Sequence, residues 1–330
     1  MDTREWTAGR LLEVSGGYWE GFTLHAAVVL DLFTLIGHRE MTADEVAEQL
    51  GEDLRGVVML LDGLVAMGLL RKERERYANT GAARSLLVKD SPRFVGHMVM
   101  HHHHLVNAWA RLAEAVKSGS PVREKGPREE EERAAFLKGM FNIASGIAPL
   151  LASQLDLSTR RHLLDLGGGP GTYAIHFCRE NPQLKATVFD LPTTEPFARK
   201  TIERFGLSER ISFVAGDYLK DDIGGQYDVA WLSHILHSVG HEACRLIIEK
   251  TVNALLPGGL LLIHDFFLNE TRDGPLFPAL FSLNMLVNTD DGRAYSEKEV
   301  EEMLLEAGLN DVKRLPFRGP NDSGIMMGVR

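Results

Sequence analysis

Cysteine is scarce in this chain, since its 330 residues include only Cys178 and Cys244. Two cysteines so far apart exclude a disulfide framework and a cysteine-rich zinc site, and they fit a reducing compartment. Long apolar runs are also missing, because none approaches the roughly eighteen residues that span a bilayer. The first ten residues, MDTREWTAGR, lack the basic stretch and apolar core of a secretion signal. We therefore expect a soluble, cytoplasmic protein without a membrane partner.

Positive charge is scarce as well, with 36 Lys and Arg against 46 Asp and Glu and a formal net charge of −10. Binding to a phosphate backbone depends on clustered Lys and Arg, so we expect no nucleic-acid partner. Acidic substrates are disfavoured too, unless a local basic pocket receives them. The length and the 44% of hydrophobic residues are enough for two domains that each have a core.

The N-terminal third has a helical pattern that leads into a charged hairpin. Apolar residues recur at three and four positions in FTLHAAVVLDLFTLI, and Thr42 with Glu45 predicts a capping box for a helix that Gly51 ends. An apolar helix follows in LRGVVMLLDGLVAMGLL, and LLRKERERYANT indicates the hairpin. This order predicts a winged helix. Its second helix, however, needs burial on most faces, whereas a helix that reads DNA needs polar and basic side chains.

The apolar excess of these N-terminal helices predicts an obligate homodimer, because a domain of this size can hardly bury them alone. Candidate contacts are Trp19, Phe22, Val28 and Phe33.

A further helical segment, residues 91–117, carries the run His101 to His104. Consecutive helical side chains point about 100° apart, so the four histidines cannot meet one metal, although a pair such as His97 with His101 could. We interpret the run as packing or pocket lining, with His101 as the candidate for a substrate pocket. Residues 118–133 have the composition of a polar linker. We place a winged-helix-like dimerisation domain at residues 1–118 and a catalytic domain at residues 119–330.

From His162 onward short apolar runs alternate with helical ones, in the order HLLDLG, KATVFDL, ISFVAGD, YDVAWLS and GGLLLIHDFF. This alternation predicts the α/β class, with a doubly wound, Rossmann-like parallel sheet and helices on both sides. Ligands of such sheets bind at the C-terminal ends of the strands.

The strongest motif is DLGGGPG, which closes the first of these strands and includes Asp165, Gly167, Gly169 and Gly171. Its spacing differs from the dinucleotide fingerprint, and Pro170 removes a backbone N–H that a pyrophosphate would need. Glycines let the backbone approach a ligand closely. The loop suits S-adenosylmethionine, which has no phosphate; a purely structural turn is the alternative.

The next two strands end in acidic residues. Asp190, followed by Leu191, closes the second strand, where a carboxylate can accept hydrogen bonds from both ribose hydroxyls. After the third strand, Asp217 can accept from an adenine amino group and Tyr218 can lie against the ring. Capping or turn formation is the alternative role for these acids.

The segment SHILHSVGHE, residues 233–242, contains His234, His237 and His241. On one helix they would share a face, as a metal site requires. Gly240 and the preceding β-like YDVAWL favour a strand, a loop and a new helix instead, from which the three side chains diverge.

Together these residues resemble the plant-type small-molecule O-methyltransferases, the group that includes caffeic acid and acetylserotonin O-methyltransferases. The matching segments are LLDLGGGPG, TVFDLP, VAGDYL, ILHSVGHEACRLI, LPGGLLLIHDF, GPLFPALFSLNMLVNTDDGRAYS and EMLLEAGL. The resemblance implies a homodimer with a winged-helix dimerisation domain. It also implies that S-adenosylmethionine is used without a metal, and that hydroxyls of aromatic or related small molecules are methylated.

By the same resemblance His237 is the general base, and Ser233 and His234 lie on the cofactor side. An imidazole, whose ordinary pKa is near 6.5, can take the proton of an acidic hydroxyl. Of the two acids that orient the base in the family, the first falls on Asp265 and the second on Ala294, which cannot do it. Ser238 stands where the family usually has Asp.

For the acceptor, the resemblance and the apolar face of LFSLNMLVN indicate Asn284 and Asn288, with Met285 as a further pocket residue. The chemistry that we expect is O-methylation of a small, aromatic or polycyclic molecule. Two alternatives stay open: an enzyme of the same fold with altered chemistry, such as hydroxylation or C- or N-methylation, and a winged-helix regulator that senses S-adenosylmethionine.

Overall fold

The computed structural model describes residues 5–123 and 129–330, so residues 124–128 of the predicted linker lie outside the described part. The chain forms two compact units, Met1–Leu105 with Glu131–Asn142, and Val106–Glu130 with Ile143–Arg330. Two helices, α7 (Gly96–Ala110) and α9 (Glu129–Gln154), contribute residues to both units. The boundary between residues 118 and 119 stays a prediction.

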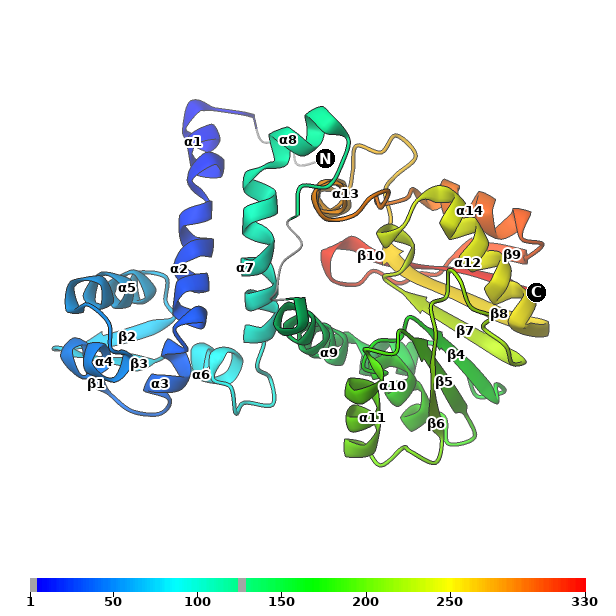
Figure 1. Ribbon diagram of the computed structural model, residues 1–330, viewed down its shortest axis with the longest axis horizontal. Helices are drawn as coiled ribbons and strands as arrows, with labels where there is room; N and C mark the ends of the chain where they lie inside the picture. Colours follow the sequence, from blue (N-terminus) through cyan, green and yellow to red (C-terminus); the bar gives the residue numbers. More distant parts are fainter. Residues whose placement is uncertain (1–4, 124–128) are drawn as a thin grey trace. The chain divides into compact units, whose positions relative to one another are not determined.

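The N-terminal unit is mostly helical and has a small antiparallel sheet in the order β1-β3-β2 (Figure 1). Besides its parts of α7 and α9 it contains α1 (Ala8–Gly16), α2 (Tyr18–Val29), α3 (Leu32–Ile36), β1 (Met41–Thr42), α4 (Ala43–Leu50), α5 (Leu54–Ala66), β2 (Leu70–Glu73), β3 (Arg76–Asn79) and α6 (Gly81–Leu87).

The predicted winged-helix order is confirmed, because α4, α5 and the β2–β3 hairpin follow one another. The capping box of Thr42 and Glu45 is formed, and Gly51 ends α4 in the left-handed conformation with φ 72°. Helix α5 buries Val57, Leu61 and Leu64 in the core of this unit. The apolar face of α5 is therefore used for packing, as its sequence predicts.

The C-terminal unit is built on a seven-stranded sheet in the order β6-β5-β4-β7-β8-β10-β9 (Figure 1). Its elements besides parts of α7 and α9 are α8 (Leu112–Ser118), β4 (His162–Leu166), α10 (Thr172–Glu180), β5 (Lys185–Asp190), α11 (Glu195–Arg204), β6 (Ile211–Ala215), β7 (Tyr227–Ser233), η1 (Leu236–Ser238), α12 (His241–Ala254), β8 (Leu255–Phe266), α13 (Leu276–Asn288), α14 (Glu297–Glu306), β9 (Asn310–Arg314), η2 (Pro320–Asp322) and β10 (Ser323–Val329).

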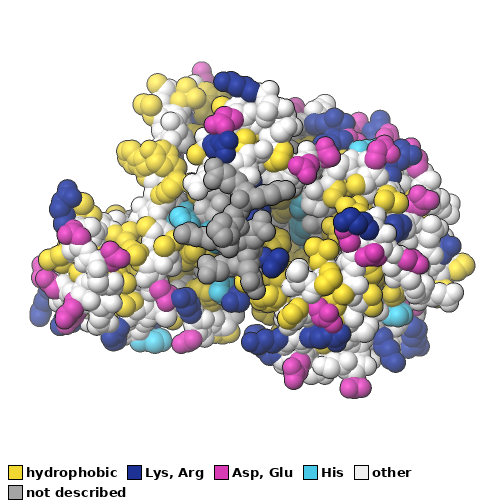
Figure 2. Space-filling model, viewed as in Figure 1, with side chains coloured by type: hydrophobic (Ala, Val, Ile, Leu, Met, Phe, Trp, Pro, Cys, Tyr) yellow, Lys and Arg dark blue, Asp and Glu magenta, His cyan; other side chains and the backbone are white. Residues whose placement is uncertain are grey.

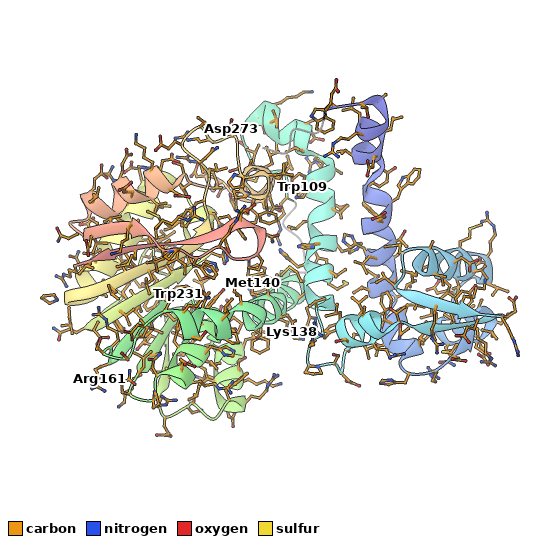
Figure 3. The ribbon with its side chains drawn as sticks, turned by 180° about the vertical axis from the view of Figure 1, so that it is seen from behind. Trp109, Lys138, Met140, Arg161, Trp231 and Asp273 are labelled. Carbon is orange, nitrogen blue, oxygen red and sulfur yellow. The ribbon has the colours of Figure 1, made fainter. Side chains whose placement is uncertain are left out.

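Both faces of this sheet are covered by helices, as the α/β prediction requires. Side chains of α12 and α14, such as Ile247 and Leu304, form one core against the sheet. Side chains of α9, α10 and α11 form the other core, which includes the fully buried Trp231 of β7 (Figure 3). Neighbouring residues of one strand point to opposite faces, so Trp231 and Leu232 belong to different cores.

Several elements differ from the sequence-based expectations, and one of them is α9, which begins at Glu129 within the predicted linker. The sheet is not purely parallel, because β10 runs antiparallel to both β8 and β9. The helix predicted at residues 91–117 is broken at Arg111, whose φ of −104° and ψ of 17° separate α7 from α8. No Gly or Pro marks that break in the sequence.

One helical segment, Arg133–Gln154, is long and apolar enough to cross a membrane by length and composition. It is not an uninterrupted apolar run, because Lys138, Asn142 and Ser145 lie within it, but its mean hydropathy is high. A core helix meets the same criteria, and Ala148 and Leu151 of this segment are fully buried in the C-terminal unit. The segment is therefore weak evidence for a membrane span.

Large apolar side chains remain exposed on α1 and α2, where Figure 2 shows yellow side chains gathered. Trp19 is 69% exposed and Phe22 is 45% exposed, so both can contact a second copy. Phe33 is wrong as a candidate contact, because it is 1% exposed and packs into the core of its own unit. Val28 is half-buried against the same core.

Trp19→Glu should weaken the homodimer, because a charge would be placed in an apolar contact. We expect light scattering at micromolar concentration to move toward the monomer mass of 36.7 kDa. Leu305→Glu is the matched control, since Leu305 is 52% exposed on α14 of the other unit. A monomeric wild type, or equal dissociation in both variants, would contradict the prediction.

Asn79→Ala should destabilise the N-terminal unit by about 1–3 kcal/mol. The Asn79 side chain is buried and its Nδ2 donates to the carbonyl oxygens of Phe33 and Gly37 at 2.8 and 2.9 Å. Its removal leaves these acceptors without their donor. Hydrogen exchange of amides in this unit should accelerate, whereas the exposed Glu48→Ala should leave the rates unchanged.

Candidate active site

The glycine-rich turn between β4 and α10 has the backbone that its sequence requires. Gly167, Gly169 and Gly171 all have positive φ values, 63°, 54° and 76°. A Cβ on Gly167 would lie 2.6 Å from Ile235 Cδ1, so the turn packs directly against the loop that follows β7. A Cβ on Gly169 would meet nothing within 4 Å, so this part of the turn faces open space.

The N–H groups of this turn are largely used inside the protein. Gly167 donates to the carbonyl of Phe189, Gly171 to that of Gly168, and Gly169 to Asp190 Oδ2 at 2.8 Å. Pro170 has no N–H to offer. The turn is therefore unsuited to cradling a phosphate, which agrees with the interpretation of the motif.

Two buried carboxylates lie beneath the turn. Asp165 is 0% exposed; its Oδ2 accepts from the Ala174 N–H at 3.2 Å and its Oδ1 has no hydrogen-bond partner. Burial, with a contribution from the charge of Asp190, raises the pKa of Asp165 to about 7. Burial also raises the pKa of Asp190, although hydrogen bonds from Gly169, Leu191 and Thr194 lower it in part. Such carboxylates favour a ligand that brings donors or positive charge.

The other two cofactor candidates lie after β6. Asp217 pairs with Lys220 at 2.8 Å, and this hydrogen bond lowers the pKa of Asp217. Tyr218 is half-buried and packs against the core beneath α12. Leu191 is 45% exposed beside Asp190. All these residues stand at the C-terminal ends of neighbouring strands, β4, β5 and β6, so the topology gathers them at one edge.

The next strands add a buried histidine and carboxylate pair. His237, in the turn η1 after β7, lies with its Nδ1 2.7 Å from Oδ1 of Asp265 near the end of β8. The side chains are 12% and 4% exposed. An ionised carboxylate only accepts, so Nδ1 carries the hydrogen and Nε2 of the neutral ring is left as the basic nitrogen.

The partners of Asp265 stabilise its ionised form. Burial alone would raise the pKa of Asp265, but the His237 and His234 imidazoles and their hydrogen bonds hold this pKa well below its usual range. The Phe266 N–H also donates to Asp265 Oδ1 at 2.8 Å. Asp265 is therefore an anion that fixes the orientation of His237.

The three histidines of SHILHSVGHE separate as the strand–loop–helix interpretation predicts. His234 lies in the loop with φ 58°, and its Nδ1 is 3.5 Å from Asp265 Oδ1. His241 begins α12 and lies 3.6 Å from Glu242. His234, His237 and Asp265 have one ligand-type atom each within 4.8 Å of the others, so this set could hold a metal ion, and His241 is not part of it.

His264, which no sequence motif marks, is buried between two serines. Its Nδ1 lies 3.0 Å from Ser233 Oγ and its Nε2 lies 3.1 Å from Ser323 Oγ. Burial lowers the pKa of His264 well below the ordinary value, so the ring is neutral. Ser233, a candidate cofactor ligand, thus contacts His264. No sequence motif marks Ser323, because β10 reaches β8 only through the fold.

An aromatic wall that no sequence motif marks lies beside His237. The ring of Phe281 meets the His237 ring edge-on at 4.8 Å, and Phe266 stacks on it at 6.2 Å. Phe277 packs against both phenylalanines. Aromatic faces of this kind suit a flat, apolar acceptor.

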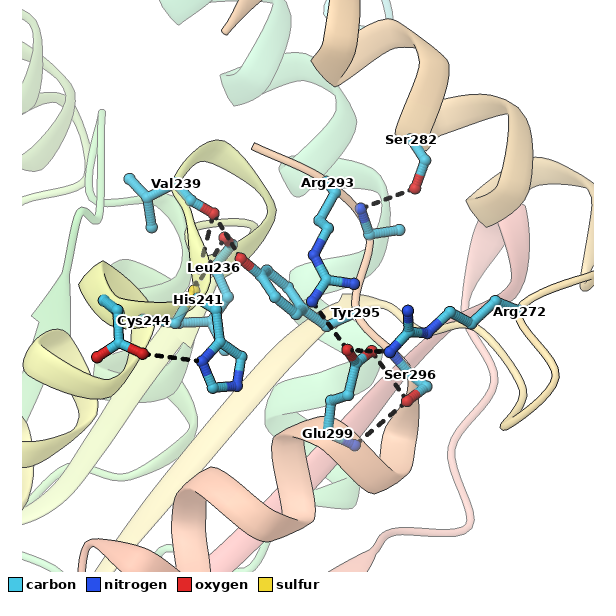
Figure 4. Close-up of polar contacts among 12 residues, drawn as sticks. Leu236, Val239, His241, Cys244, Arg272, Ser282, Arg293, Tyr295, Ser296 and Glu299 are labelled. Carbon is cyan, nitrogen blue, oxygen red and sulfur yellow. Dashed lines mark hydrogen bonds and ion pairs between the residues drawn. The ribbon is translucent and has the colours of Figure 1, made fainter. Parts of the chain in front are cut away.

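The turn that carries His237 is anchored from α12 and from the segment before α14 (Figure 4). Tyr295 donates its hydroxyl to the carbonyl of Val239 at 2.7 Å, and Cys244 Sγ lies 3.3 Å from the carbonyl of Leu236. Arg293 covers the Tyr295 ring and pairs with Glu299 at 2.8 Å.

The segment before α14 also requires small side chains near the base. A Cβ on Gly292 would lie 2.6 Å from the His237 carbonyl oxygen. Ala294, where the family has its second acid, is 1% exposed, and its N–H donates to Ser282 Oγ at 2.9 Å (Figure 4). No acid can therefore act on His237 from this position.

The acceptor candidates on α13 form a polar contact with α7. Asn284 Oδ1 accepts from the indole of Trp109, which is labelled in Figure 3, at 2.8 Å and from Asn288 Nδ2 at 3.1 Å. Asn288 Oδ1 is buried without a hydrogen-bond partner, and Met285 is 7% exposed. His101 belongs to the other unit, where its ring lies 5.1 Å from Phe136.

The strand-end residues fit S-adenosylmethionine. The unpartnered Oδ1 of Asp165 offers a buried acceptor for a positively charged donor, and Asp190 Oδ2 has one lone pair beyond its bond to Gly169. Open space over Gly169 lets a ligand approach the backbone. No group in this set is suited to a phosphate.

Comparison with known proteins agrees with this geometry. Residues 108–310 match the family model of an O-methyltransferase domain, and residues 12–89 match that of the O-methyltransferase dimerisation domain. One relative is a 3-hydroxy-5-methyl-1-naphthoate 3-O-methyltransferase of Streptomyces sahachiroi, 34% identical over 97% of this chain and 94% of its own. Another is the tetracenomycin polyketide synthesis 8-O-methyl transferase TcmO of Streptomyces glaucescens, 34% identical over 96% of both chains.

Among solved structures, PigF with SAH superposes with a TM-score of 0.91 and 28% identity, over 98% of this chain and 100% of that one. The expected α/β fold with a helical dimerisation domain is thus confirmed. The chain belongs to the family of O-methyltransferases with an N-terminal dimerisation domain.

Proposed function

We propose that the protein is a homodimeric, cytoplasmic methyltransferase that transfers a methyl group from S-adenosylmethionine to a hydroxyl of a small aromatic or polycyclic molecule, with His237 as general base. The observation that carries the base assignment is the buried His237–Asp265 pair, in a loop whose Ile235 packs against the glycine turn. When bound, the cofactor supplies an activated methyl electrophile, so the protein needs to position the acceptor and remove its proton.

The residues around the turn divide this work. Asp165 and Asp190 supply acceptors for the charged and hydroxyl groups of the cofactor. Leu191, Asp217 and Tyr218 surround its adenine ring. The Nδ1–H of His237 donates to Asp265, and the opposite nitrogen, Nε2, accepts the proton of the acceptor hydroxyl. Asp265 then stabilises the imidazolium that forms, because an opposite charge at 2.7 Å in a buried site favours it.

The aromatic wall beside His237 supports the proposed acceptor class. Phe266, Phe277 and Phe281 present aromatic surface to the side of His237, which supports a flat ring system as acceptor. The naphthoate and polyketide enzymes among the relatives are consistent with this class. Asn284 and Asn288 stay candidates for polar contacts, and the buried Asn288 Oδ1 is the acceptor atom that lacks a partner.

The structure favours an enzyme over a DNA-binding regulator. Helix α5, which would read a DNA groove in a winged helix, buries Val57, Leu61 and Leu64 in its own core. Both cysteines are free and buried, which fits a reducing compartment. Altered chemistry on the same fold would be recognised by methyl transfer that does not depend on His237.

Asp190→Ala should weaken cofactor binding by about a hundredfold, because a charge-assisted acceptor is lost. Calorimetry with S-adenosylhomocysteine gives the dissociation constant. Asp222→Ala is the matched control, since Asp222 is exposed. Unchanged affinity in a folded Asp190→Ala protein would reject the site assignment.

His237→Gln should lower turnover by about a hundredfold or more while the affinity for S-adenosylhomocysteine stays near wild type. Glutamine keeps polarity and approximate size but cannot take the proton. The loss should shrink for acceptors that are already ionised at the assay pH, since they have no proton to remove. Radiolabelled cofactor and a panel of phenols, enols and amines provide the assay.

The control for this variant is His241→Gln, which changes a partly exposed histidine outside the pair. Full activity of His237→Gln would point to altered chemistry. Loss of wild-type activity on chelation, with rescue by added zinc or iron, would mean that the histidines hold a metal.

A further inference from the structure

Lys250 of α12 extends its ammonium group to the turn that follows β6. Its Nζ donates to the carbonyl oxygen of Tyr218 at 2.7 Å and also to that of Asp221. The same turn carries Asp217 and Tyr218, the two residues that we propose for the adenine ring. Lys250 is 32 residues from Tyr218 in the sequence, so the fold brings this lysine to the backbone on which both adenine candidates stand.

The turn itself is closed by hydrogen bonds around Asp217. The Asp217 carbonyl accepts from the N–H groups of Lys220 and Asp221 at 2.9 and 2.7 Å. Its carboxylate accepts from the Leu219 N–H at 3.0 Å, and its own N–H donates to Asp221 Oδ2 at 2.8 Å. These bonds join residues of one turn and fix its shape. The bonds from Lys250 join the turn to a helix that covers the sheet.

Helix α12 is held in place by its core contacts. Ile247 and Val252, on either side of Lys250 in the sequence, are buried in the core between α12 and the sheet. Lys250 itself is half-buried, so its aliphatic stem is covered while its charged end reaches the turn. An ammonium group has three donor hydrogens and can bond two carbonyls at once. The spacing between the turn and α12 therefore depends on the lysine side chain.

The positive charge of Lys250 also acts on Asp217. The pKa of Asp217 is lowered by its hydrogen bond with Lys220 and, less strongly, by the charges of Lys220 and Lys250. The Lys220 side chain is 80% exposed, so salt screens its charge more than that of the half-buried Lys250. An ionised carboxylate accepts more strongly from an N–H donor than a neutral group does.

A displacement of this turn would change two proposed contacts together. A Cβ on Gly167 would lie 3.6 Å from Cε1 of Tyr218, so the Tyr218 ring stands beside the glycine turn. The Asp217 carboxylate comes one residue earlier on the same turn. The position of both side chains relative to the glycine turn thus depends on what holds the backbone between them.

We propose that Lys250 is a positioning residue for S-adenosylmethionine: by binding the carbonyls of Tyr218 and Asp221, it places Asp217 to accept from the adenine amino group. Lys250 acts through the turn and not by contact with the cofactor. Its role is to select a purine that carries an amino group, and it is separate from proton transfer at His237. This inference rests on the proposed function, which assigns Asp217 to adenine.

Calorimetry on the full-length protein with two ligands tests this role. S-adenosylhomocysteine has the amino group, whereas S-inosylhomocysteine has an oxygen in its place and gives Asp217 no donor there. Lys250→Met keeps a long apolar stem and removes the charge and the donors. We expect this variant to bind S-adenosylhomocysteine about tenfold more weakly, the scale of one hydrogen bond to a charged group. Its affinity for S-inosylhomocysteine should stay near that of the wild type.

Three further measurements separate positioning from a general loss of structure. Lys250→Arg restores a charged donor and should recover most of the preference for S-adenosylhomocysteine. Lys250→Gln keeps a neutral donor and should show the same selective loss at a smaller size. With saturating cofactor the turnover of Lys250→Met should stay near wild type while KM for S-adenosylmethionine rises, because the His237–Asp265 pair follows other strands. Lys298→Met, at an exposed position of α14, is the matched control.

Several results would overturn the inference. One is unchanged affinity for S-adenosylhomocysteine in Lys250→Met; another is equal weakening of both ligands in Lys250→Met and Lys250→Gln, which would mean general support of the fold. A wild type that binds the two ligands equally would also reject it. Failure of the proposed cofactor site gives a different result, since Asp190→Ala would then bind S-adenosylhomocysteine as the wild type does.

Discussion

The buried carboxylate of Asp265 is the constraint on which the proposed chemistry depends. A carboxylate that is 4% exposed is stable as an anion only if donors and positive charge surround it, and here these are two imidazoles and a backbone N–H. Its position is fixed by β8, a central strand of the sheet, so the rings that bind it are fixed as well. Orientation of the base is thus a consequence of satisfying one buried charge.

The rest of the catalytic unit holds the partners of that carboxylate in place. The turn with His237 is bonded through Tyr295 and Cys244, and Gly292 lets the chain pass close to its carbonyl. On the other side, Ile235 packs against Gly167, so the loop that carries His237 is in direct contact with the glycine turn. This contact brings together segments that follow two different strands, β7 and β4.

Asp165 and Asp190, which we propose as cofactor ligands, differ from Asp265 in their electrostatics, although all three are largely buried. Asp265 has histidine partners and a lowered pKa, whereas Asp165 lacks a partner for one oxygen and its pKa is raised to about 7. A bound ligand with positive charge would supply to Asp165 what the imidazoles supply to Asp265. Asp265 is thus already paired within the protein, whereas Asp165 has one carboxylate oxygen free to bind a ligand.

Sequence alone determined the fold class, the winged-helix order, the glycine turn after β4 and, through family resemblance, the pairing of His237 with Asp265. These features depend on local rules: apolar periodicity, the capping box of Thr42 and the positive φ of glycines in DLGGGPG. It could not place β9 and β10, find the break at Arg111, or tell that Phe33 packs inward. Only the tertiary structure brought His234 and Ser323 to β8 and set the phenylalanines beside the base, because these contacts join residues far apart in the chain. Their positions depend on strand order and packing, which local periodicity does not encode.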